Sequence, residues 1–426
     1  MLVEFTVSNF KSFKEPRTFS LVASKNKEHL DTNSFQVNDK TRLLNSAVMY
    51  GANASGKSNF FLALLFFFRF TISSGPKLQI GDSIDTEPFL FSKQARNEPS
   101  TFELIFFLDG VRYRYGISVD NHIVQQEYLF AVKKVQEVKL FTRVKQDIEI
   151  NPTYFKEGQK IKKAVRENAS FLSICAQLNG ETSKTIISYM QNCIVTSGLF
   201  SKGMNKSERL LEQKGRDAVI KFLSFADIQI KDIKTETSPV DFSNIKDKDF
   251  EELLRKKMVG INEEKVYFGH TVYDETEAVG TQFLDINEES AGTKKLFDYT
   301  DNILNTLERG TPLFIDEFDS RLHPLIIEGI VKLFNSPESN PNHAQLVISC
   351  HAVNIMTNKL FRRDQIWFCE KDQYGSTDLY SLVEYNEPVR NDASFSKNYL
   401  QGRYGAVPYL DGNNREIMTA WKKGKE

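Results

Sequence analysis

Residues 43–58 read Leu-Leu-Asn-Ser-Ala-Val-Met-Tyr-Gly-Ala-Asn-Ala-Ser-Gly-Lys-Ser. The second half, residues 51–58, carries two glycines, a lysine and a hydroxyl residue at the spacing of a phosphate-binding loop. The apolar residues 43–50 predict a buried strand, and residues 59–70 predict a helix. Strand, loop and helix in this order are the context that such a loop requires, so this stretch predicts a site for a nucleoside triphosphate.

Each residue type in the loop has a physical reason. Gly51 and Gly56 let the backbone turn tightly, so that its N–H groups point inward at phosphate oxygens. Lys57 is expected to reach the outer phosphates, and the Ser58 hydroxyl is expected to ligate Mg²⁺. The predicted nucleotide-binding residues of this stretch are Gly51, Asn53, Ser55, Gly56, Lys57, Ser58 and Asn59.

The composition limits the class of protein. The chain has 426 residues, of which 40% are hydrophobic and 26% charged, as expected for a soluble globular protein with a large core. Its 55 basic and 56 acidic residues give a net charge of -1, which argues against a dedicated nucleic-acid binder but leaves a local basic patch open.

The cellular location is expected to be the cytoplasm. The four cysteines are scattered without a Cys-x-x-Cys pair, which is typical of reduced cytosolic thiols. The first residues predict a strand in place of a signal peptide. The most apolar run, residues 60–68, is too short to span a bilayer, so no membrane association is expected.

Two further apolar strands end in chemically useful side chains. Residues 311–317 end in Asp316 and Glu317; Asp316 suits Mg²⁺ coordination, and Glu317 is placed to polarise an attacking water. Residues 345–351 end in His351, which is expected to contact a γ-phosphate. We therefore predict Glu317 and His351 as catalytic residues, with Ser58 and Asp316 as the Mg²⁺ ligands.

A possible anion site precedes the acidic strand. Residues 289–294 read Glu-Ser-Ala-Gly-Thr-Lys and lead into a helix that continues to about residue 307. Ser290 would cap this helix, and the helix N-terminus attracts anions. Ser290, Gly292 and Lys294 are therefore candidate nucleotide-binding residues, although a plain helix cap accounts for the same pattern.

The rest of the chain suggests three segments. Strands are expected over residues 2–24 and 122–150, with a hairpin around Asp109-Gly110 between them. Arg112 and Arg114 on this hairpin fit either a nucleic-acid patch or, preferably, a solvated strand face. Helical spacing begins near residue 155, with helices expected at residues 161–168, 170–178, 182–193 and 215–225. The predicted domains are residues 1–154, a helical insertion at 155–275, and residues 276–426.

The order of these motifs resembles that of ABC-type ATPases. The opening stretch Asn-Phe-Lys-Ser-Phe at residues 9–13 is similar to the SMC, RecF and OLD branch of that group, and residues 319–324 resemble its D-loop. Residues 367–372, 378–382 and 399–408 resemble the RloA/AbiLi-type AAA ATPases of bacterial anti-phage and abortive-infection systems. Two departures stand out: Ala291 and Thr293 replace the Gly and Gln of the full Leu-Ser-Gly-Gly-Gln motif, and no Asp-x-Asp pair of an OLD-type nuclease follows His351.

The resemblance implies a fold, a reaction and partners. The fold class would be α/β, an ABC-type P-loop ATPase head with a mixed sheet, an antiparallel β layer and a helical insertion. Two heads would sandwich two ATP molecules as a homodimer or larger oligomer, with Lys57 and Ser58 of one head facing Ser290 and Gly292 of the other. The implied role is that of an ATP- and Mg²⁺-dependent sensor and regulator that controls a separately encoded effector, a toxin or nuclease, in phage defence. Two alternatives stay open: a RecF/SMC-like ATPase of DNA repair or chromosome maintenance, and an ATP-binding scaffold without turnover, against which Glu317 argues.

Overall fold

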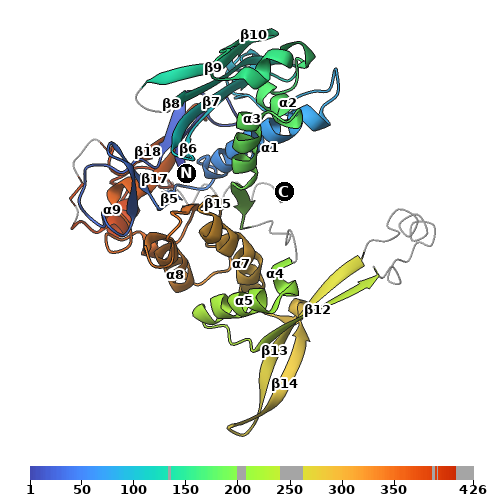
Figure 1. The fold of residues 1–426 in the computed structure, drawn as a ribbon. Coiled ribbons are helices and arrows are strands. Elements are labelled where there is room, and N and C mark those ends of the chain that lie inside the picture. The colour runs from blue at the N-terminus through green and yellow to red at the C-terminus, as the bar shows by residue number, and fades with distance from the viewer. Residues whose placement is uncertain (133–135, 199–207, 240–261, 386–388, 391, 409–426) are drawn as a thin grey trace, which may run out of the picture.

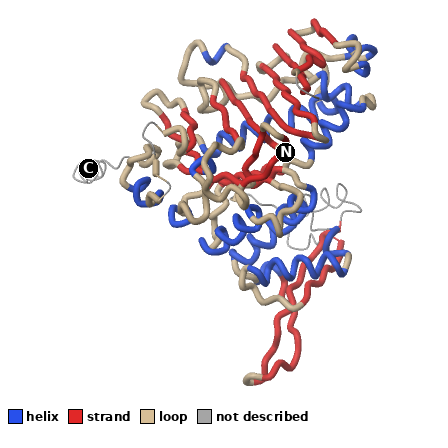
Figure 2. The backbone as a smooth tube through the Cα atoms, turned by 60° about the vertical axis from the view of Figure 1, so that its left-hand side comes forward, coloured by secondary structure: helices blue, strands red, loops and turns tan. Residues whose placement is uncertain are grey.

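Two β-sheet layers enclose the longest of the helices that the structure describes (Figure 1). The computed structural model describes residues 1–132, 136–198, 208–239, 262–385, 389–390 and 392–408. A separate three-stranded sheet extends away from the two layers, as both backbone views show (Figures 1 and 2). The predicted mixed sheet and antiparallel layer are both present.

The first layer is a seven-stranded antiparallel sheet in the order β10-β9-β8-β7-β6-β1-β2. This sheet contains β1, the first strand of the chain. The predicted hairpin around Asp109-Gly110 joins β6 to β7. Its strands are β1 (Leu2–Ser8), β2 (Arg17–Ser20), β6 (Ser100–Leu108), β7 (Val111–Val119), β8 (Val124–Val132), β9 (Glu137–Val144) and β10 (Asp147–Ile150).

The second layer is a six-stranded mixed sheet in the order β11-β15-β16-β5-β17-β18. Its first five strands run parallel, so their carboxyl ends meet at one edge, where open α/β sheets bind ligands. The phosphate loop after β5 therefore lies at the same edge of the sheet as the segments that follow β15, β16 and β17. The strands are β5 (Ser46–Tyr50), β11 (Ile194–Ser197), β15 (Pro312–Asp316), β16 (Gln345–Ser349), β17 (Ile366–Lys371) and β18 (Thr377–Ser381).

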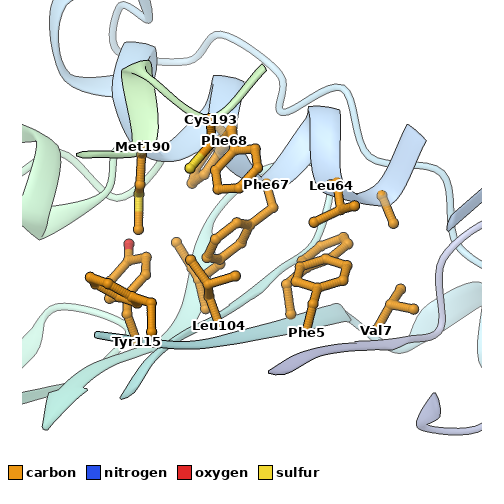
Figure 3. Packing of buried hydrophobic residues seen from close by; sticks show 14 of the residues in the cluster. Phe5, Val7, Leu64, Phe67, Phe68, Leu104, Tyr115, Met190 and Cys193 are labelled. Carbon is orange, nitrogen blue, oxygen red and sulfur yellow. The ribbon is translucent and has the colours of Figure 1, made fainter. Parts of the chain in front are cut away.

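Helix α1 (Lys57–Lys77) forms the core between the two layers. The Phe67 ring lies 5.7 Å from that of Phe5 on β1, while the Phe68 ring lies 6.3 Å from that of Phe314 on β15. Figure 3 shows Leu64, Phe67 and Phe68 above the strands of the antiparallel layer. Among the described residues, α1 is long and apolar enough to cross a membrane, but 56% of its most apolar window is buried, as in the core helix of a globular protein.

The opposite face of the mixed sheet is covered by a second group of helices. The turn at 402–408 follows the last helix of this group. Gly402 and Gly405 have positive φ in this turn, and the hydroxyl of Tyr399, on that helix, donates to the Ala406 carbonyl at 3.0 Å. This turn therefore packs as a structural element next to the sheet. The helices are α5 (Gln213–Phe225), α7 (Ala291–Arg309), α8 (Pro324–Asn335) and α9 (Phe395–Leu400).

The segment predicted as a helical insertion, 155–275, is helical only in part: the helices expected at 170–178, 182–193 and 215–225 are confirmed, but strands that were not predicted also occur in it. Helices α2 (Phe171–Gln177) and α3 (Glu181–Gln191) pack on α1, and β11 is an edge strand of the mixed sheet, parallel to β15. Helix α4 (Glu208–Leu211) and α5 lead into a sheet of β12 (Asp232–Pro239), β13 (Asn262–Asp274) and β14 (Glu277–Asp285). Residues 199–207 and 240–261 of the segment lie outside the described residues. Local helical spacing does not reveal that a strand such as β11 pairs with β15, which lies far away in sequence.

Two local expectations are also corrected. The helix expected at residues 161–168 is absent: this stretch contains the short 3-10 turn Lys162–Ala164, which follows another at Lys156–Lys160. At the end of the stretch, the side chain of Asn168 donates to the Gln79 and Asp82 carbonyls. Between the strands expected at 2–24 and 43–50, where no strand was predicted, lies β3 (Ser34–Asn38), which pairs with β4 (Thr41–Leu44). In both places tertiary contacts override local propensity.

Candidate nucleotide-binding site

The phosphate loop has a geometry that its two glycines permit. Gly56 has a φ of +110°, and a Cβ there would lie 2.1 Å from Oγ1 of Thr377 on β18. A Cβ on Gly51 would lie 2.4 Å from the carbonyl oxygen of Cys369 on β17. Neither position therefore has room for a side chain, and the loop backbone lies directly against the ends of β17 and β18.

Lys57 lies inside the loop. Its Nζ donates to the carbonyl oxygens of Gly51 at 2.7 Å and Ala52 at 3.1 Å. Burial lowers the pKa of Lys57, while the nearby carboxylates of Asp316, Glu317 and Asp319 oppose this shift. The Ser55 hydroxyl is buried without a hydrogen-bond partner among the described residues. A desolvated ammonium and an unpaired hydroxyl in a loop of inward N–H groups fit a phosphate chain.

A cavity of about 390 Å³ opens above the loop. It brings together residues from the carboxyl ends of four strand-loop connections, including Glu317 after β15 and His351 after β16. The lining residues are Asn53, Ala54, Ser55, Gly56, Lys57, Ser58, Asn59, Glu317, His351 and Lys371. The cavity thus brings Glu317 and His351 together with every predicted loop residue except Gly51. Asp316, the predicted Mg²⁺ ligand, is not on its lining either.

Ser349 on β16 links the two acidic residues. Its Oγ donates to Oδ1 of Asp316 and accepts from the backbone N–H of Glu317 at 2.7 Å. Glu317 adopts a φ of +49°, which is uncommon for a residue with a side chain. The strand therefore ends in a sharp turn that separates the directions of the two carboxylates.

The donor set suits Mg²⁺. Asp316 is buried beside Ser349, and Ser58 is on the lining of the cavity. Hydroxyl and carboxylate oxygens are the ligands that Mg²⁺ prefers, and the ion keeps several waters and substrate oxygens. Ser58 and Asp316 can therefore hold Mg²⁺ together with a nucleotide.

Gly198, at the end of β11, is a site residue that sequence reasoning missed. Its N–H donates to the Asp316 carbonyl at 2.6 Å, and a Cβ there would lie 1.9 Å from the Glu317 carbonyl oxygen. The end of β11 thus packs against the backbone that carries both carboxylates. The sequence signal, a glycine after a four-residue strand, is visible only once β11 is known to join this sheet.

His351 is held through its backbone. Oδ2 of Asp319, in the predicted D-loop, accepts from the N–H groups of His351 and Ala352, each at 2.8 Å. The imidazole itself is exposed on the cavity lining. Asp319 therefore couples the segment after β15 to the segment after β16.

Ser290 caps α7, as the sequence indicated. Its Oγ accepts from the Thr293 N–H at 3.1 Å, and Nζ of Lys294 donates to the Asn287 carbonyl at 3.0 Å. Ser290 is exposed, and neither Ser290, Gly292 nor Lys294 is on the lining of the cavity above the phosphate loop. Within one chain, the structure does not bring these three residues to the loop.

A polar network supports the loop from the side. The Thr377 hydroxyl lies 2.8 Å from the Ser55 carbonyl oxygen and 2.7 Å from the Ser12 hydroxyl, to which the Asn59 side chain also donates at 2.7 Å. Ser12 belongs to the Asn-Phe-Lys-Ser-Phe stretch, so this motif supports the phosphate loop.

On the antiparallel layer, Arg114 pairs with Glu103 and Glu137, which agrees with the solvated strand face that the sequence favoured.

A mixed sheet with a phosphate loop, an acidic strand end and a strand-end histidine at one edge, facing an antiparallel layer across α1, is the arrangement of a P-loop nucleotide-binding protein. A family model described as "AAA domain, putative AbiEii toxin, Type IV TA system" matches residues 46–357. This match covers more than half of the chain, and the protein belongs to that family.

Comparisons with individual proteins gave two further findings. No curated protein matches the chain. Among solved structures, the SMC head domain from Thermotoga maritima is similar, with 13% sequence identity and a TM-score of 0.40, over 89% of this chain and 98% of that one.

Proposed function

We propose that this protein hydrolyses ATP between two copies of the chain and uses the resulting rearrangement to control a separately encoded effector in phage defence. The observation that carries the proposal is the presence of Lys57, Ser58 and Glu317 in one cavity. The family description, which mentions a toxin of a toxin–antitoxin system, supports the defence role over a role in DNA repair. Four buried free cysteines support a cytoplasmic location.

The residues of the cavity have separate tasks in this reaction. Lys57 and the loop N–H groups bind the β- and γ-phosphates, while Ser58 and Asp316 hold the Mg²⁺. Bound Mg²⁺ withdraws charge from the phosphate oxygens. Glu317 takes a proton from a water whose oxygen bonds to the γ-phosphorus, and the bond from that phosphorus to the β–γ bridging oxygen breaks, so that ADP and phosphate form. His351 donates to the γ-phosphate.

The position of Ser290 supports a composite site. The residue is exposed at the N-terminus of α7, a 19-residue helix whose positive end attracts anions, and it lies outside the cavity of its own chain. In the proposed dimer, Ser290 and Gly292 of one copy contact the γ-phosphate bound by the other. The Lys294 ammonium adds positive charge at the same helix end.

The test is complementation between two inactive variants. Ser290→Arg should bind ATP without hydrolysing it, and Lys57→Ala should fail to bind it. In an equal mixture, half of the dimers are mixed and each has one intact site, so about a quarter of the wild-type ATPase activity should return if all dimers exchange freely. If Ser290 only caps its helix, Ser290→Arg should lose about 1 kcal/mol of stability and keep its turnover.

Heterodimer formation has to be shown independently, by co-purification of two differently tagged variants. Recovery of activity in such heterodimers supports the composite site. Absence of recovery, with heterodimers present, would contradict the ABC-type arrangement and favour a monomeric or ring ATPase. A toxin-like neighbouring gene would support the defence role, whereas a replication operon would favour DNA repair.

A further inference from the structure

A second lysine, Lys371, lines the cavity above the phosphate loop, and the resemblance of residues 367–372 to the RloA/AbiLi-type ATPases gave it no role. Lys371 is the last residue of β17, and its side chain is exposed on the lining of the cavity that holds Lys57 and Glu317. None of the ion pairs formed within the described residues includes it. We propose that Lys371 is a second cation for the phosphate chain, which it contacts from β17, a different strand from the one that leads to Lys57. This inference rests on the proposed ATPase function.

The backbone of Lys371 is fixed against the phosphate loop. In the β17–β18 ladder, Lys371 is opposite Thr377, whose N–H donates to the Ser12 carbonyl at 2.7 Å and whose hydroxyl contacts the Ser55 carbonyl. Two residues earlier, the Cys369 carbonyl oxygen limits the space at Gly51. The position of Lys371 is therefore set by rigid elements that touch the loop at two points, and only its flexible side chain has to move toward a ligand.

The charges of the cavity call for such a cation. Fully ionised ATP with one Mg²⁺ keeps about two negative charges, and Lys57 compensates one of them. Glu317 adds a further negative charge to the same cavity. About two negative charges therefore stay uncompensated, and Lys371 compensates one of them without crowding the loop, since it comes from a different strand.

The two lysines differ in their surroundings. Lys57 is buried and already donates to two loop carbonyls, whereas Lys371 is exposed at the edge of the cavity. Removal of Lys57 changes the interior of the loop, but truncation of Lys371 leaves the loop and its supports intact. A variant of Lys371 is therefore expected to fold normally and to report on phosphate binding alone.

The experiment is calorimetric titration of the full chain with MgATP and MgADP. A hydrogen bond between charged partners predicts that Lys371→Ala weakens MgATP binding by about ten- to a hundredfold. Lys371→Arg keeps the charge and should bind within about threefold of wild type. Lys40→Ala, which removes an exposed lysine in the β3–β4 turn, is the matched control and should bind as wild type does. Thermal unfolding confirms that each variant folds.

The outcomes separate the inference from the proposed function. If Lys371→Ala binds MgATP as wild type does while Lys57→Ala does not bind, the inference is overturned and the nucleotide site stands. If Lys57→Ala also binds as wild type does, the proposed function falls with it. Equal losses in Lys371→Ala and Lys371→Arg would overturn the role of Lys371 as a phosphate cation, because the charge would then not matter.

Discussion

Ser349→Ala tests whether the hydrogen bonds behind the acidic strand end serve the reaction. Ser349 is fully buried on β16, and its Oγ joins Oδ1 of Asp316 to the N–H of Glu317. Alanine removes one oxygen and leaves both groups without this partner. A hydrogen bond to a charged group contributes about 1.5–3 kcal/mol and a neutral one about 0.5–1.5 kcal/mol, so the free energy of unfolding should fall by about 2–4 kcal/mol.

The same change should weaken the Mg²⁺ site. Loss of a hydrogen bond that orients a metal ligand typically costs about 10- to 100-fold in metal affinity or activity. We therefore expect ATP turnover by Ser349→Ala to need about 10- to 100-fold more Mg²⁺. Its rate at saturating Mg²⁺ should also fall, because the backbone N–H of Glu317 loses its hydrogen bond to Oγ of Ser349. The assays are urea unfolding and ATPase activity over a Mg²⁺ titration.

Ser100→Ala is the matched control. Ser100 is also buried, on β6 of the antiparallel layer, and its Oγ donates to the Asn9 carbonyl at 2.6 Å and accepts from the Thr86 hydroxyl at 2.9 Å. The control should lose stability too and keep the wild-type Mg²⁺ dependence. If Ser349→Ala is destabilised but shows wild-type turnover and Mg²⁺ dependence, its hydrogen bonds are purely structural and our reasoning is refuted.

Four further predictions concern the cavity. Lys57→Ala should abolish tight ATP binding, since the loop loses its buried cation; unchanged affinity in calorimetry would remove the basis for the site. Glu317→Gln should bind ATP, hydrolyse it about 10²- to 10⁴-fold more slowly and accumulate as an ATP-bound dimer; light scattering without an ATP-dependent mass change would argue against a shared site. Gly198→Ala should reduce turnover more than ATP affinity, because its Cβ would lie 1.9 Å from the Glu317 carbonyl oxygen; wild-type turnover would show that β11 does not position Glu317. Burial lowers the pKa of Lys57 and bound phosphate raises it, so ATP binding in alkaline buffer should take up protons, seen as a binding enthalpy that depends on the ionisation enthalpy of the buffer; an enthalpy independent of the buffer would contradict this.

Local chemistry in the sequence determined the parts of the site that lie within one strand-loop unit. The loop at 51–58, the carboxylates at 316 and 317, His351 and the Ser290 cap each combine a residue type with a spacing that is visible over a few positions. The hairpin at Asp109-Gly110 was predictable for the same reason. The structure brings the loop, Glu317 and His351 into one cavity because parallel strands end at a common edge.

Only the tertiary structure decided which distant residues support these groups. Gly198 follows β11, and Ser349, Thr377 and Lys371 lie on three other strands; none of the four was predicted from the sequence to support the site. Strand order depends on pairing between segments that can be more than a hundred residues apart, as β11 with β15 shows, and such pairing energies do not appear in local patterns. For the same reason the strands within 155–275 were not predicted, although three of its four expected helices were, and the separation of Ser290 from Lys57 within one chain became visible only in three dimensions.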